Sequence, residues 1–158
     1  MDKKITDWLK VGALVGFLTI PILWALARLP MLQITFSTIS LNLREKVTQN
    51  LLGPEFAEFI KGYLGISITM PALIAGVISG ALLVVAAKWI LDKTPFKPKK
   101  FAKLTTVVFI ALLIEMVVLN FLVVPTFGAI LGFAIAAIAV SGAVYGIYKQ
   151  VLKKPLPE

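Results

Sequence analysis

The sequence predicts an all-α membrane protein, a polytopic bundle of four transmembrane helices with short amphipathic helices in the first external loop. Two observations carry this prediction. Apolar residues make up 59% of the chain and the mean hydropathy is +0.94, whereas an average soluble protein is about 45–50% apolar. The charged residues, moreover, lie almost entirely between long apolar runs. A single domain over residues 1–158 is too small to bury that much apolar surface, so we expect a bilayer to be its solvent.

The first predicted span covers about residues 9–28. Between Lys10 and Arg28 lie 17 uncharged residues, with Trp8 and Trp24 near the two ends. A helix rises 1.5 Å per residue, so this run spans a hydrocarbon core of about 30 Å once its flanking residues are included. Aromatic residues near both ends suit the two membrane interfaces.

An alternative interpretation makes residues 1–27 a cleaved signal peptide. Lys3 and Lys4 precede the apolar stretch, which ends in the A-x-A pattern Ala25-Leu26-Ala27. The run exceeds the apolar region of about 7–15 residues that is usual in signal peptides. We therefore expect a retained helix.

The remaining spans are predicted at about 66–88, 104–124 and 127–148. Residues 62–87 carry no charge, and the 45 residues from Leu104 to Tyr148 carry one, Glu115. A continuous helix of that length would be about 67 Å long, too long for one crossing. The cluster Pro125-Thr126-Phe127-Gly128 is the natural break, because proline and glycine end helices, and a hairpin of two helices follows.

The external segment, about residues 40–63, is too polar to cross a membrane. Leu43, Val47 and Leu51 recur at a spacing of four after a possible N-cap at Ser40, and Gly53-Pro54 ends this first amphipathic piece. In a second piece the apolar residues fall on one helical face, namely Phe56, Phe59, Ile60 and Tyr63. This segment either packs against the protein's own helices or provides a docking surface for a partner.

Orientation follows from the basic residues of the loops. The N-terminal tail, the loop 88–103 and the C-terminal tail hold 12 of the 16 lysines and arginines. We therefore predict that both termini and this basic loop are cytoplasmic, in a multi-pass protein of the cell (inner or plasma) membrane. The 12 residues are Lys3, Lys4, Lys10, Lys88, Lys93, Lys97, Lys99, Lys100, Lys103, Lys149, Lys153 and Lys154.

The loop 88–103 also mixes lysines with aromatic residues, as binders of nucleic acid or anionic lipid do. We interpret Lys97, Lys99, Lys100 and Lys103 as residues that set the topology and contact lipid headgroups. Membrane lipids are thus expected partners, and nucleic acid is not.

Two absent residue types exclude most active-site chemistry. The chain has no cysteine and no histidine, which removes thiolate nucleophiles, Cys-ligated metals and the commonest general base. We predict no metal site and no cofactor. An intramembrane enzyme ranks last among the function classes, since no second acid lies within the spans.

Glu115 is the main candidate for a functional residue. It falls near the predicted midplane, where an ionised carboxylate is costly, and a low dielectric favours its neutral form. Thr19, Ser79 and Ser141 are predicted at similar or slightly shallower depth and are the candidate hydrogen-bond partners. Such a site suits either ion or proton handling or a structural hydrogen bond between helices.

Small residues at intervals of four predict close helix packing. They are Gly76 and Gly80 in the second span and Gly128, Gly132 and Ala136 in the fourth. Asn120, on another face of the third helix than Glu115, is a further candidate for interhelical contact. The contacts could form within the monomer, between copies, or with a partner's helix.

These features favour a non-catalytic integral membrane subunit or accessory protein that packs against other membrane components or itself. The alternative is a small oligomeric transporter or channel linked to protons or cations, with Glu115 binding the ion.

Overall fold

The computed structural model describes residues 3–26, 28, 53–63, 67–120 and 127–157, and every regular element among them is helical. The long helices are α1 (Lys3–Leu26), α4 (Met70–Asp92), α5 (Lys100–Asn120) and α6 (Phe127–Gly146). A short helix, α3 (Pro54–Tyr63), precedes α4, and a π-helical turn (Ile147–Val151) follows α6. The all-α prediction is confirmed for the described residues.

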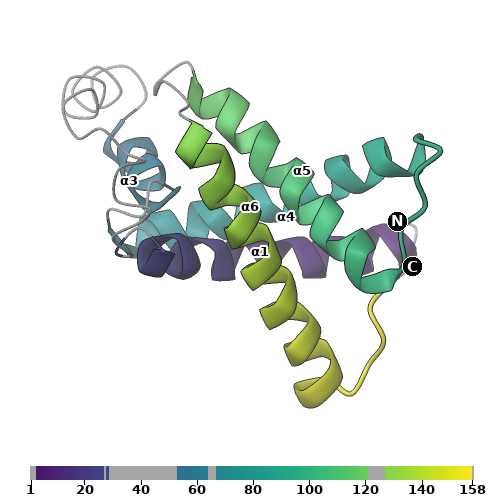
Figure 1. The fold of residues 1–158 in the computed structure, drawn as a ribbon. Coiled ribbons are helices and arrows are strands. Elements are labelled where there is room, and N and C mark those ends of the chain that lie inside the picture. The colour runs from purple at the N-terminus through teal and green to yellow at the C-terminus, as the bar shows by residue number, and fades with distance from the viewer. Residues whose placement is uncertain (1–2, 27, 29–52, 64–66, 121–126, 158) are drawn as a thin grey trace.

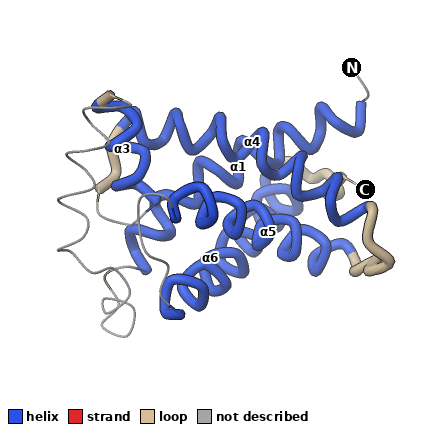
Figure 2. The backbone as a smooth tube through the Cα atoms, turned by 90° about the horizontal axis from the view of Figure 1, so that it is seen from above, coloured by secondary structure: helices blue, strands red, loops and turns tan. Residues whose placement is uncertain are grey.

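The long helices form two packed pairs. Antiparallel α1 and α4 share the most extensive interface, and α5 and α6 lie against them (Figures 1 and 2). Helix α6 crosses α1 obliquely, and α5 contacts α4. Both chain termini and the α4–α5 loop lie at one end of the molecule, whereas α3 lies at the other (Figures 1 and 2). The three segments richest in lysine are thus gathered at one end.

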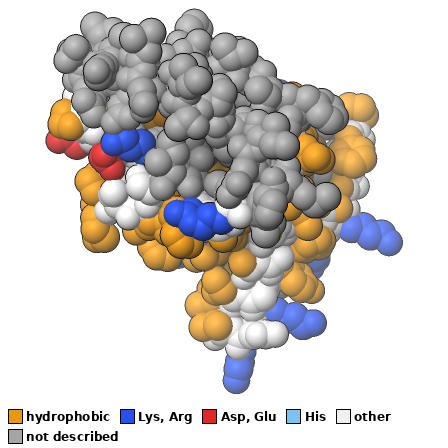
Figure 3. Space-filling view, turned by 60° about the vertical axis from the view of Figure 1, so that its left-hand side comes forward, with side chains coloured by type: hydrophobic (Ala, Val, Ile, Leu, Met, Phe, Trp, Pro, Cys, Tyr) orange, Lys and Arg blue, Asp and Glu red, His pale blue; other side chains and the backbone are white. Residues whose placement is uncertain are grey.

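Three helices are long and apolar enough to cross a membrane, over Lys4–Leu26, Met70–Asp92 and Ile130–Val151. Hydrophobic side chains cover much of the described surface on the face in Figure 3. On α4 the residues at every fourth position, Met70, Ile74, Ile78 and Leu82, are exposed, while Ala72, Gly76, Gly80 and Val84 are buried. A helix with an apolar outer face is expected in a protein surrounded by lipid.

Glycines bring α1 and α4 together. A Cβ atom added to Gly12 would lie 2.5 Å from the carbonyl oxygen of Gly80, and one added to Gly80 would lie 2.5 Å from that of Gly12. Gly16 meets Gly76 one turn further along. Real Cβ atoms do not approach other atoms so closely. The two backbones therefore touch directly, which maximises dispersion contact where no hydrophobic force drives association.

The helices on either side of the basic loop extend further into it than the sequence predicted. Helix α4 begins at Met70, where Thr69 Oγ1 accepts a hydrogen bond from the amide of Ala72 and Pro71 suits the first turn. It continues to Asp92, and α5 starts at Lys100. The segment 88–103 is therefore non-helical only over residues 93–99. An ion pair between Lys88 and Asp92, one turn apart, supports the last turn of α4.

Helix α3 packs on the end of the α1/α4 pair. Phe59 and Ile60 are buried in the common core, and Glu55 is exposed. A Cβ on Gly62 would lie 2.9 Å from Cβ of Ala72 on α4. The first predicted amphipathic piece, over residues 40–52, lies outside the described residues.

Candidate functional site

Glu115 lies on α5 with only 4% of its surface exposed. It is the buried acidic residue of the described part of the chain. Ala111 and Leu112, one turn before it, belong to the apolar core. The carboxyl group is thus enclosed by protein, where a polar group is costly to bury unless it is hydrogen-bonded.

The three predicted hydroxyl partners differ in burial and bonding. Thr19 on α1 is buried, and its Oγ1 donates to the carbonyl oxygen of Val15 at 2.7 Å. Ser79 on α4 is half-buried, and its Oγ donates a hydrogen bond to the carbonyl oxygen of Gly76 at 3.2 Å. Ser141 on α6 is fully buried, and its Oγ has no hydrogen-bond partner among the described residues. Bonds to a carbonyl three or four residues back are typical of hydroxyls inside helices.

The polar side chains are therefore spread over the core. Glu115, Thr19 and Ser141 are the buried polar residues of the described chain, and they come from α5, α1 and α6. Helix α6 contacts both α1 and α5, so all three lie within one packed unit. No hydrogen bond joins Ser141 to Glu115, and the hydroxyl protons of Thr19 and Ser79 are directed at their own helices.

The depth of Glu115 can be counted along α5. Lys103 is the last lysine of this helix, and Glu115 follows it by 12 residues. That distance is about 18 Å along the axis, slightly past the middle of a hydrocarbon core about 30 Å thick. Because α5 is inclined to α1 and α4 (Figure 1), the distance from Lys103 to Glu115 is shorter when it is measured along the axes of α1 and α4. The sequence prediction that Glu115 lies near the middle of an apolar layer thus depends on α5 crossing the membrane.

A cluster of ion pairs around Asp92 lies at the lysine-rich end of the molecule. Asp92 pairs with Lys88 on its own helix and with Lys103 of α5, at 3.6 Å for the second pair. The Lys88 ammonium also lies 5.7 Å from the ring centre of Trp8, which is buried near the start of α1. This cluster joins α1, α4 and α5. Lys103, predicted to contact lipid headgroups, is thus engaged within the protein, whereas Lys97, Lys99 and Lys100 are exposed.

The small residues of α6 are used differently from those of α4. A Cβ on Gly132 would meet no described atom within 4 Å, so the close contact predicted there is absent from the described structure. Ala136, one turn later, is fully buried. Because α6 crosses α1 obliquely (Figure 1), only part of its length can face the core. The side-chain surroundings of Gly128 and Asn120 lie outside the described residues.

Among the described residues, no group of three acidic, histidine or cysteine side chains could hold a metal ion. Comparisons of the chain with protein-family models, with curated proteins and with solved structures found no match.

Proposed function

We propose that this chain is a non-catalytic integral membrane protein that packs against another membrane component, a second copy or a partner's helix, through the outer face of α6. The observation that carries the proposal is the surface around Gly142 and Gly146. These glycines are four residues apart, and a Cβ on either would meet no described atom within 4 Å. Within the molecule, glycines at the same spacing hold α1 against α4. A second pair facing outward offers the same close approach to a helix from another chain.

The surroundings of Glu115 support a structural role for this acid. It is almost fully buried, and none of the three pockets described at the lysine-rich end is lined by it. Two contacts hold the helices together at different positions along their length. The glycines join α1 to α4, and the ion pairs of Asp92 join α4 to α5. A transporter needs an access path to its site and movement between helices, and a tightly joined α1/α4 pair favours neither.

We also propose that α5 is the fourth span and that the lysine-rich end is cytoplasmic. Helix α5 has 21 residues, about 31 Å of helix, and Glu115 is the only charged residue that it holds after Lys103. The gathering of both termini and the α4–α5 loop at one end (Figure 1) fits an even number of crossings and the positive-inside rule.

A labelling experiment tests this topology, and the cysteine-free chain makes each introduced thiol unique. Lys97→Cys and Glu55→Cys place thiols at exposed positions near opposite ends. In intact cells, a membrane-impermeant maleimide should label Glu55→Cys, and Lys97→Cys only after permeabilisation. Equal labelling of both before permeabilisation would contradict the proposed orientation.

Cross-linking in native membranes tests the proposed packing. Gly142→Cys places a thiol on the α6 face, and Leu82→Cys, on the exposed apolar face of α4, is its matched control. We expect a short homobifunctional maleimide, or oxidation, to capture Gly142→Cys in a defined adduct and to leave Leu82→Cys uncaptured. Native mass spectrometry after mild detergent extraction should show the same assembly. A monomeric mass together with no adduct at Gly142 would refute the proposal.

A second candidate function, proton- or cation-linked transport, is supported by the burial of Glu115, Thr19 and Ser141 in a single core. A protonatable acid with hydroxyls on neighbouring helices can bind and release a proton or cation. Reconstituted vesicles test it through ion or proton flux. Flux in the native protein that is lost in Glu115→Gln, with assembly unchanged, would favour transport over the structural role.

A further inference from the structure

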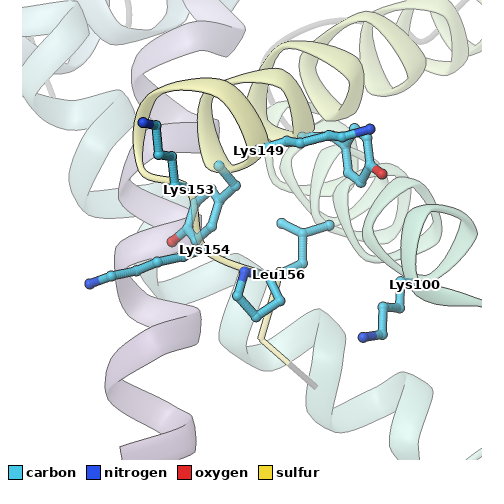
Figure 4. A pocket seen from close by; sticks show the side chains of 8 residues that line it. Lys100, Lys149, Lys153, Lys154 and Leu156 are labelled. Carbon is cyan, nitrogen blue, oxygen red and sulfur yellow. The ribbon is translucent and has the colours of Figure 1, made fainter.

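A pocket of about 440 Å³ lies where the start of α5 meets the C-terminal end of the chain. Four lysines and two tyrosines contribute to its wall, namely Lys100, Lys149, Lys153, Lys154, Tyr145 and Tyr148. Figure 4 shows the labelled lysine side chains spread around the hollow, with Leu156 between them. The pocket therefore has a cationic rim and an apolar interior.

The shape of the C-terminal tail creates this pocket. At the end of the π-helical turn, the amide of Leu152 donates a hydrogen bond to the carbonyl oxygen of Ile147 at 3.0 Å. The amide of Lys154 donates to the carbonyl oxygen of Tyr148, also at 3.0 Å. Lys153 adopts a positive φ of 50°, which L-residues rarely adopt. The chain thereby reverses and buries Leu156, which is 8% exposed, against the core. This anchored tail holds its two lysines beside the start of α5.

The charges of the pocket are not balanced within the described protein. None of its four lysines forms a salt bridge with a described residue, whereas Lys88 and Lys103 share Asp92. Among the described residues, Asp7 lines an adjoining pocket and pairs with Lys10 at 4.0 Å. Gathering like charges is unfavourable unless an anion offsets them.

We propose that this pocket binds the phosphate of an anionic lipid headgroup. The ammonium groups point away from one another around the hollow (Figure 4), and their flexible side chains can turn to offer charge and hydrogen bonds to phosphate oxygens. The tyrosine hydroxyls add donors, and Leu156 lines the wall between them. Phe101 and Tyr145, in edge-to-face contact at 5.7 Å between ring centres, are exposed beside the pocket, as aromatic residues at a membrane interface are. The assignment rests on the membrane orientation proposed above, and not on the α6 docking face.

Lipid retention by the full-length protein tests the assignment. Purified protein is titrated with phosphatidylglycerol or phosphatidylcholine of matched acyl chains, and bound lipid is counted by native mass spectrometry. We expect one phosphatidylglycerol to be retained per chain in preference to phosphatidylcholine. Each lysine near a membrane surface contributes about a fivefold gain for anionic lipid, so Lys153→Gln with Lys154→Gln should weaken retention about 25-fold.

Two further variants separate a built site from general surface charge. Lys4→Gln with Lys93→Gln makes the same charge change at exposed lysines outside the 440 Å³ pocket, and should retain phosphatidylglycerol nearly as well as the native protein. Leu156→Ala leaves every charge in place but loosens the tail, and should weaken retention at least severalfold.

Several outcomes would overturn the proposal. Equal losses in the two lysine double variants would show diffuse electrostatic attraction, and unchanged retention in Leu156→Ala would show that the tail geometry is irrelevant. Inorganic phosphate alone, if it competed as effectively as phosphatidylglycerol, would assign the site to a free anion. Lipid retention is read independently of cross-linking at Gly142, so failure here is distinguishable from failure of the proposed function.

Discussion

The α1/α4 pair and the α5/α6 pair are built by opposite means. Between α1 and α4, four glycines remove side chains from the interface and the backbones touch. The second pair instead contributes larger side chains such as Leu112, Phe133 and Val140 to the common core, together with two buried polar residues, Glu115 and Ser141. The glycines of α6 at 132, 142 and 146 have open space around them.

The glycines of α1 and α4 are used for contact within the molecule, whereas those of α6 are open to contact with another molecule. Direct backbone contact leaves few side chains to rearrange at the glycine positions, so we expect the α1/α4 pair to be the stiffer part of the fold. The second pair carries the buried acid, the exposed glycines and the lysine pocket. We infer that α1 and α4 serve as the scaffold, and that interactions with lipid or another chain belong to α5, α6 and the tail.

The largest effect should come from adding a methyl group to the scaffold interface. In Gly80→Ala the new Cβ would lie 2.5 Å from the carbonyl oxygen of Gly12 and 2.6 Å from Cα of Gly16. Both are backbone atoms, so the helices must separate. We expect a loss of about 2–4 kcal/mol in the free energy of unfolding, measured by thermal or denaturant unfolding in a constant detergent.

Gly142→Ala is the matched substitution in the other pair. Because its Cβ would meet no described atom, the exchange should be neutral or stabilising by up to about 1 kcal/mol, the difference in helix propensity. Gly142→Leu should keep the monomer folded but weaken the assembly seen by native mass spectrometry. Equal destabilisation by Gly80→Ala and Gly142→Ala would remove the distinction between the two pairs.

The next effect tests how the α5/α6 pair accommodates its acid. Glu115→Ala removes most of a buried side chain, and the resulting cavity should cost about 2 kcal/mol of unfolding free energy. Glu115→Gln keeps the shape and hydrogen-bonding capacity, so we expect a change below about 1 kcal/mol. Unfolding in detergent measures both. A glutamine variant as unstable as the alanine variant would show that the carboxylate itself is required.

The two pairs were also unequally predictable from the sequence. The apolar runs indicated the helices, and Gly76 and Gly80 stood out by their spacing. Their partners Gly12 and Gly16 have the same spacing and were missed, although that pattern was a usable signal. The oblique course of α6 could not be predicted, because periodicity gives a helix's apolar face and not its crossing angle.

The lysine pocket illustrates a second limit of sequence reasoning. Lys100 and Lys149 are 49 positions apart, so no local motif joins them. The positive φ of Lys153 and the burial of Leu156 arise only when the tail meets the folded bundle. Counting lysines predicts their side of the membrane, but not the pocket they form.

A smaller effect is expected at the ionic cluster that joins the two pairs. Asp92→Asn leaves Lys88 and Lys103 without their shared carboxylate. Because Asp92 is about half exposed, we expect a loss of about 0.5–1 kcal/mol in unfolding free energy, reduced at high salt. Asp7→Asn, which breaks only the 4.0 Å pair with Lys10, is the control and should change stability less. A salt-independent loss in Asp92→Asn would point to packing instead.

The smallest effect compares one buried hydroxyl from each pair. Thr19 on α1 donates to Val15, whereas the Ser141 hydroxyl on α6 has no partner among the described residues. Thr19→Val should lower the unfolding free energy by about 0.5–1 kcal/mol, since it removes a hydrogen bond and keeps the shape. Ser141→Ala should be neutral or slightly stabilising, because burying a hydroxyl without a partner is unfavourable. If Ser141→Ala instead destabilises the protein or weakens its assembly, the hydroxyl has a partner in another chain or in the undescribed segments. The contacts of the α5/α6 pair would then be more specific than its open glycines indicate.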